Sequence, residues 1–150
     1  MIAWKYIDKP SATVAALRDY GSMRNIINIT PEDIKELYSR MVSPRNSKPS
    51  HTPRSYSPGK AEELLTASLD KLDAMQERYR LAIEYMGWFE PAWGSLSDIE
   101  QTVLREFYMN PSQKSGATAR LEVQLNYGKS NIDKIRRKAL SRLAMLLFGK

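Results

Sequence analysis

Polar and basic side chains gather near the C-terminal end of the sequence, in a stretch with the periodicity of a helix. An apolar residue recurs every three or four positions, at Ile132, Ile135, Ala139, Leu143 and Leu146, which predicts one buried face. The opposite face then carries side chains that can hydrogen bond to base edges: Lys129, Ser130, Asn131, Asp133 and Lys134. Asparagine can bind adenine through two hydrogen bonds, lysine can bind guanine or phosphate, and a helix start favours a phosphate. This pattern predicts a recognition helix for nucleic acid.

Further basic residues in the same region are candidates for contacts with backbone phosphates: Lys114, Arg120, Arg136, Arg137 and Lys138. Residues 113–150 contain nine Lys or Arg against two acidic residues, whereas residues 60–112 contain five against ten, within a net charge of +6. A basic segment beside an acidic one is typical of a phosphate-binding face. By charge alone, a solvated basic helix is an equally good interpretation.

Two shorter helices are predicted to position this recognition helix. Ser97 and Glu100 have the spacing of a capping box, which starts a helix that runs to about Met109. A second helix begins after Gly116, and its end at Asn126 suits a residue that tolerates the left-handed conformation. A turn at residues 126–128 then leads into the basic helix, which begins near Ser130. Two helices joined by so short a turn are the layout of a helix-turn-helix.

These helices resemble region 4 of bacterial sigma factors. The resemblance of the first helix rests on Leu96, Ser97, Glu100, Val103, Leu104, Phe107 and Tyr108. Residues 125–140 align without a gap with the helix-turn-helix of that family, and its core positions fall on Leu125, Ile132, Ile135, Ala139, Leu140 and Leu143. The resemblance covers residues 96–150 and implies promoter contacts at or beside Lys129, Ser130, Asn131, Asp133 and Lys134.

Three residues differ from the family pattern. Asn126 and Gly128 replace the glycine and threonine that are usual in the turn, and Asp133 stands where a basic residue is common. The base sequence that the family reads is therefore not carried over to this chain.

The whole arrangement is similar to late-gene transcriptional regulators of phages and prophages, namely the RinA-type activators and the autolysin-regulator (ArpU-like) family. This resemblance implies a sequence-specific regulator that binds double-stranded DNA and activates late genes with host RNA polymerase. A DNA-packaging adaptor of the small-terminase type, which would bind DNA through the same helix-turn-helix, is the alternative. A helical protein whose basic tail never meets DNA is a third interpretation.

The rest of the chain is also predicted to be helical, which makes the fold all-α. We expect an N-terminal helical segment at 1–42, a Pro/Ser-rich linker or loop at 43–59, a long helix with an aromatic hinge at 60–94 and the helix-turn-helix domain at 95–150. Within the first segment, Gly21 is expected to break the helix and Thr30-Pro31 to start a new one.

The long helix carries a heptad seam at Leu65, Leu69, Leu72, Gln76, Tyr79, Ile83 and Met86. Such a seam can form a homodimer through residues 60–89, or it can pack within the chain on the apolar stripe of residues 34–41 as a helical hairpin. The aromatic residues that follow, Trp88, Phe89 and Trp93, are expected to form a packing cluster rather than a platform for bases, because their neighbours are acidic.

Composition argues against several classes of protein. The sequence contains no cysteine and one histidine, His51, and it has no glycine-rich phosphate loop, so we expect no enzyme activity, no metal site and no cofactor. No apolar run approaches the roughly 20 residues that span a bilayer. The expectation is a cytoplasmic protein of a bacterial host cell with no membrane contact.

Overall fold

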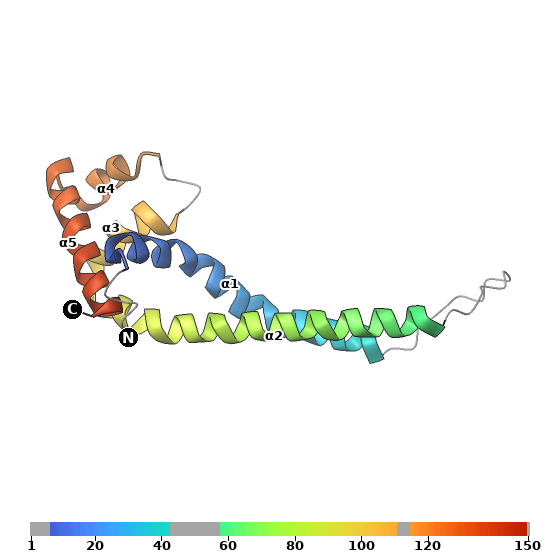
Figure 1. Ribbon diagram of the computed structural model, residues 1–150. Coiled ribbons are helices and arrows are strands. Elements are labelled where there is room, and N and C mark those ends of the chain that lie inside the picture. The colour runs from blue at the N-terminus through green and yellow to red at the C-terminus, as the bar shows by residue number, and fades with distance from the viewer. Residues whose placement is uncertain (1–6, 43–57, 111–114, 150) are drawn as a thin grey trace. The chain divides into compact units, whose positions relative to one another are not determined.

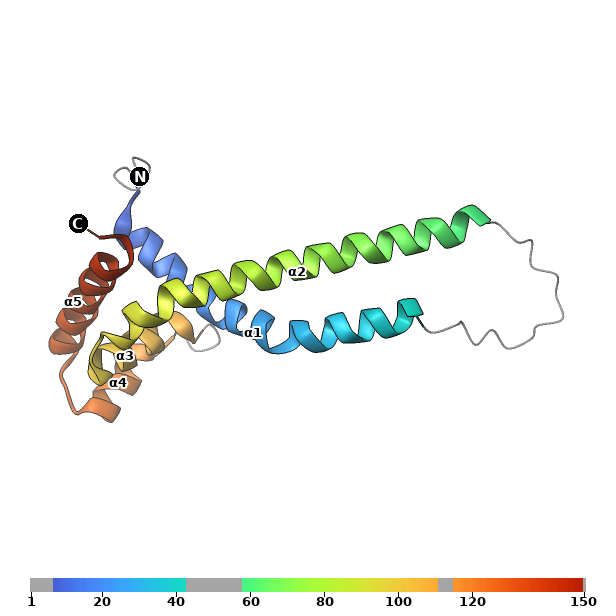
Figure 2. The same ribbon diagram turned by 90° about the horizontal axis from the view of Figure 1, so that it is seen from below.

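The computed structural model describes residues 7–42, 58–110 and 115–149, and within these ranges every regular element is a helix (Figures 1 and 2). The elements in chain order are α1 (Lys9–Val42), α2 (Pro58–Gly94), α3 (Asp98–Leu104), the π-helix η2 (Arg105–Met109), α4 (Ala117–Leu125) and α5 (Lys129–Phe148). The predicted all-α fold is confirmed. Most of the predicted linker 43–59 and the predicted phosphate contact Lys114 lie outside the described residues.

The chain divides into two compact units, and the division passes through α1 and α2. Unit 1 contains the described residues up to Arg24 and those from Glu84 onward, while unit 2 contains those between Asn25 and Ile83. The region predicted as a helix-turn-helix domain therefore shares unit 1 with the start of α1 and the end of α2.

α1 is longer than the sequence pattern predicted. Its start is capped by Asp8, whose carboxylate accepts a hydrogen bond from Ser11 Oγ at 2.8 Å. The helix then continues through Gly21 and Pro31, so the expected break and the expected new start are both wrong. A glycine costs about 1 kcal/mol and a proline about 3 kcal/mol inside a helix. Burial of side chains such as Leu17, which is fully buried, offsets costs of this size.

α2 also continues beyond its predicted end near Phe89. It runs through Pro91 to Gly94, so the expected aromatic hinge is in fact the last part of the helix. Phe89, Ala92 and Trp93 are all buried, and their spacing of three and four residues places them on one helix face. The prediction that these aromatic residues pack into a cluster is confirmed.

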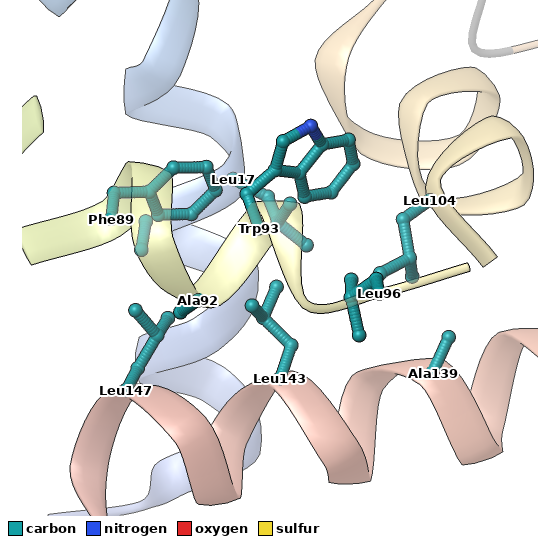
Figure 3. Close-up of a cluster of buried hydrophobic side chains, with 10 residues drawn as sticks. Leu17, Phe89, Ala92, Trp93, Leu96, Leu104, Ala139, Leu143 and Leu147 are labelled. Carbon is teal, nitrogen blue, oxygen red and sulfur yellow. The ribbon is translucent and has the colours of Figure 1, made fainter. Parts of the chain in front are cut away.

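The core of unit 1 collects side chains from both ends of the chain (Figure 3). Phe89 stacks on Tyr85 and on Trp93, with ring centroids 5.4 and 5.9 Å apart. Tyr85 donates its hydroxyl hydrogen to the backbone oxygen of Ala16, and burial raises the pKa of this hydroxyl, which stays a donor at neutral pH. The last turns of α2 thus hold the start of α1 and the end of α5. The buried cluster contains Ala16, Leu17, Phe89, Ala92, Trp93, Leu96, Leu104, Ala139, Leu143 and Leu147.

In unit 2 the second half of α1 and the first half of α2 run side by side as a two-helix hairpin (Figures 1 and 2). The two helices line a common groove. Among the described residues of this unit, only Thr30, Leu72 and Ala82 are buried. The predicted heptad seam is therefore only partly covered, since Leu72 is buried while Leu65 and Leu69 remain about half exposed.

Candidate nucleic-acid interface

The last three α-helices and η2 pack around a second apolar cluster in unit 1. Val103 of α3, Leu121 of α4 and Ile132 of α5 are all fully buried in it. Ser97 caps α3 as predicted, because its side chain accepts a hydrogen bond from the amide of Glu100 at 3.3 Å. α3 continues directly into η2, and three residues join α4 to α5. The packing of these helices on the cluster fixes the start of α5 against α3 and α4.

The connection between α4 and α5 is a turn of three residues. Asn126 ends α4 in the left-handed conformation, with φ of 56° and ψ of 39°, as its residue type predicted. Gly116, which precedes α4, also has a positive φ of 81°. These two residues set both ends of α4, so the sequence predicted the α4 bounds closely.

The buried face of α5 differs from the predicted one at its C-terminal end. Ile132, Ala139 and Leu143 are buried and Ile135 is half-buried, but Leu146 is 45 % exposed, so its predicted burial is wrong. Ala144 and Leu147 are buried instead, because this end of α5 packs on the aromatic cluster of α2. Trp88 Nε1 donates to the backbone oxygen of Leu147 at 3.2 Å and fixes that orientation.

The polar face predicted for base contacts is exposed at the start of α5. Lys129, Ser130, Asn131 and Lys134 are all exposed. Asn131 also borders a shallow depression of about 280 Å³ that α5 forms with the start of α3, lined by Ser97, Ile99, Glu100, Tyr127, Asn131, Ile135 and Lys138. The start of α5 therefore presents donors and acceptors beside basic side chains, without an enclosed site for a small ligand.

Asp133 is engaged within α5 rather than presented as an open acceptor. One carboxylate oxygen lies 2.6 Å from Arg136 Nη2, and the other lies 2.5 Å from Arg137 Nη2. The hydrogen bond from Arg137, assisted by the charges of both guanidinium groups, lowers the pKa of Asp133. The carboxylate thus neutralises part of the basic charge on this side of α5.

Two of the predicted phosphate contacts, Arg120 and Arg136, have partners in η2. Arg120 Nε donates to Glu106 at 3.1 Å, and Arg120 also donates to the backbone oxygen of Ser115. The Arg136 guanidinium lies over the Phe107 ring, 4.8 Å from its centroid. Glu106 and Phe107 both belong to η2, so these contacts join the π-helix to α4 and to α5. Arg137 and Lys138 are both exposed, and Arg137 pairs with Asp133.

Sequence reasoning missed the polar contacts between helices that brace this region. Arg142 of α5 lies 3.1 Å from Glu100 of α3, so Glu100 pairs across the fold in addition to its place in the cap. The partners in this pair and in the Glu106–Arg120 pair are far apart along the chain, so helical spacing does not predict these contacts. The Asp133 pairs had such a signal, because acidic and basic residues three and four positions apart are neighbours on a helix.

Comparison of the chain with protein-family models, curated proteins and solved structures found no match. Among the residues that the structure describes, no helix is both long and apolar enough to span a bilayer. Within the same residues, acidic and histidine side chains do not gather into a group that could hold a metal ion.

Proposed function

We propose that this chain is a sequence-specific DNA-binding protein that regulates transcription, with the start of α5 in the major groove of duplex DNA. The observation that carries the proposal is the exposure of Lys129, Asn131 and Lys134 on a helix that a three-residue turn and a buried cluster hold in place. An α-helix fits the major groove, and these side-chain types bond base edges there. A three-helix arrangement with a short turn before the exposed helix is what helix-turn-helix proteins use.

The ion pairs within unit 1 divide the basic residues into two groups. Arg120 and Arg136 contact η2, so their main role is to hold α4 and α5 in position. Lys138 is exposed on α5 and is the better candidate for a phosphate contact, while Arg137 is exposed but pairs with Asp133 in the same helix. Phosphate contacts supply affinity without sequence information, whereas the side chains at the helix start supply the discrimination.

The biological setting follows from the resemblance to phage and prophage late-gene regulators. In that setting the protein activates transcription together with RNA polymerase of the bacterial host. The basic, exposed start of α5 supports the DNA-binding part of this proposal, while the polymerase partner rests on the resemblance alone.

Replacing Asn131 and Lys134 by alanine tests the base-reading role. We expect the double variant to lose its preference for duplex from the protein's own upstream region over random duplex by about 30-fold or more, because each good base contact contributes roughly 1–3 kcal/mol of discrimination and two are removed. Residual affinity for random duplex should remain, since other basic side chains contact phosphates. Band shifts with both duplexes measure the ratio of the two affinities.

A matched control for that experiment is the pair Asn25→Ala and Lys35→Ala in α1, which removes the same two side-chain types from exposed positions of unit 2. This control should keep the preference of the unaltered protein. Equal loss of affinity for both duplexes in the Asn131→Ala, Lys134→Ala variant would refute base reading and leave only phosphate binding.

Replacing Asp133 by asparagine is expected to raise the affinity for DNA rather than lower it. Because the carboxylate pairs with Arg136 and Arg137, its removal releases positive charge toward a phosphate. We expect affinity for random duplex to rise several-fold and the dependence on salt to steepen, with log K falling by about 0.9 more per log unit of salt for each added phosphate contact. Fluorescence anisotropy at several salt concentrations measures both quantities.

The control for this change is Asp73→Asn, at an exposed position of α2 in unit 2, which alters the net charge equally. If Asp73→Asn raised the affinity as much as Asp133→Asn does, the effect would come from net charge rather than from the Asp133 pairs.

A further inference from the structure

The two-helix hairpin of unit 2 exposes apolar side chains at the end where α1 stops and α2 starts. We call this set of residues the tip patch. Its members range from 44 % to 78 % exposed and all lie in the last turns of α1 or the first turns of α2: Tyr38, Val42, Leu64, Leu65 and Leu69. Large apolar side chains grouped in this way mark an interaction surface more often than chance exposure.

A groove between the two helices runs through the tip patch. Its volume is about 550 Å³, and its apolar lining includes Leu37 and Met41 from α1 together with Leu64 and Leu65 from α2. A neighbouring depression of about 210 Å³ shares Leu37 with it. An apolar ridge of another helix can fill a groove of this kind, as ridges and grooves do between packed helices.

The hairpin needs a partner for this face. Only three of its described residues are buried, and a helix must bury its apolar stripe against another element to be stable. The five side chains of the tip patch are too few for a standard interface of roughly 1,600 Å², so a contact between two copies would belong to the small, weak class below about 1,200 Å².

We propose that the tip patch binds the tip patch of a second copy of this chain. A two-fold interface uses the same surface on both copies, so that surface must be compatible with itself. The charged residues that line the groove and its neighbouring depression are Asp33, Glu36, Arg40 and Lys71, of which Glu36 and Arg40 pair with each other within α1, so the set carries no net charge. A surface of one sign would instead repel a second copy.

The spacing of the exposed leucines also favours a second copy of this chain as the partner of the tip patch. Leu65, Leu69 and Leu72 follow at intervals of four and three on α2, which is the repeat of a seam between paired helices. Leu72 is buried inside the hairpin, whereas Leu65 and Leu69 continue the same row into solvent. In the dimer, the second copy covers Leu65 and Leu69, which the single chain leaves about half exposed.

Sedimentation equilibrium of the full chain, without DNA, tests this interface separately from the proposed function. We expect the unaltered chain to form dimers within about 1–100 µM. The variant with Leu65→Asp and Leu69→Asp should raise the dimer dissociation constant at least about 100-fold, because it places charges in the desolvated centre of the contact. Helix content measured by circular dichroism should be unchanged, since both leucines are about half exposed.

Leu81→Asp is the matched control, because Leu81 is 48 % exposed but lies outside the tip patch. It is about 160° around α2 from Leu65 and should leave the dimer intact. A second variant, Leu65→Gln with Leu69→Gln, repeats the test with neutral side chains that favour helix if the aspartates reduce helix content.

Three results would overturn the proposal. The unaltered chain could stay monomeric over the whole concentration range, the Leu65 and Leu69 variants could dimerise as well as Leu81→Asp does, or the chain could form a larger ring-like assembly. Loss of DNA binding by a chain that still dimerises would bear on the proposed function alone.

Discussion

Reversing the charge of both Lys134 and Lys138 is expected to lower affinity for duplex DNA by on the order of 100-fold at about 0.1 M salt. Both lysines are exposed on α5, the helix that we propose for the major groove. Each substitution removes an attraction and adds a repulsion toward phosphate. Fluorescence anisotropy with a labelled duplex measures the change, and the slope of log K against log salt should become shallower by about 1 for the phosphate contact of Lys138.

The matched control reverses Lys35 and Lys60, which are exposed in unit 2 and change the net charge by the same amount. If general charge governed binding, the two double variants would lose affinity equally. We expect instead that Lys35→Glu with Lys60→Glu changes affinity by only about two- to three-fold, since both residues belong to unit 2 and the proposed binding face belongs to unit 1. Equal losses would contradict a binding face on α5.

Truncation of Phe89 is expected to have the largest effect on stability. Its ring is fully buried, stacks on Tyr85 and Trp93, and lies in the cluster that joins α1, α2 and α5. Phe89→Ala should lower the free energy of unfolding by about 3–5 kcal/mol, because it removes a large apolar group and leaves a cavity. Total stabilities are about 5–15 kcal/mol, so this is a large fraction. Urea denaturation followed by circular dichroism measures the change.

Val123→Ala in α4 is the control for that experiment, since Val123 is 86 % exposed. It should change the free energy of unfolding by no more than about 0.5 kcal/mol. A loss below about 1 kcal/mol for Phe89→Ala would contradict the packing of the aromatic cluster, because full burial of a phenyl ring contributes at least about 1.5 kcal/mol.

Local chemical signals predicted the boundaries of the C-terminal helices well. Ser97 caps α3, Gly116 precedes α4, and Asn126 ends α4 in the left-handed conformation. Each of these signals depends on the capping side chain or the backbone preference of a single residue, so it can be read from the local sequence. The same reasoning failed at Gly21 and Pro31, where α1 continues although both residue types disfavour the interior of a helix.

The buried face of α5 shows why periodicity alone was insufficient. Ile132 packs in one apolar cluster, while Ala139, Leu143 and Leu147 pack in the other. The helix changes neighbours along its length, so the buried face at its C-terminal end is set by the aromatic end of α2. A single repeat extended along the sequence therefore selected Leu146, which is exposed, in place of Leu147.

The sequence predicted which polar residues of α5 are exposed, but not which basic residues have partners on other helices. The sequence placed Lys129, Asn131 and Lys134 on an exposed face, and all three are exposed. It did not anticipate that Arg120 would pair with Glu106, because these residues are 14 positions apart and meet only after η2 and α4 fold together. Roles that depend on such pairs need the tertiary structure.

Selection from a pool of randomised duplexes by the full chain is the most direct measurement of sequence-specific binding. We expect the recovered duplexes to share a common sequence after repeated rounds, and the variant with Asn131→Ala and Lys134→Ala to recover either no common sequence or a different one. Recovery of the same sequence by both proteins, or of random sequences by the unaltered chain, would contradict base reading by the start of α5.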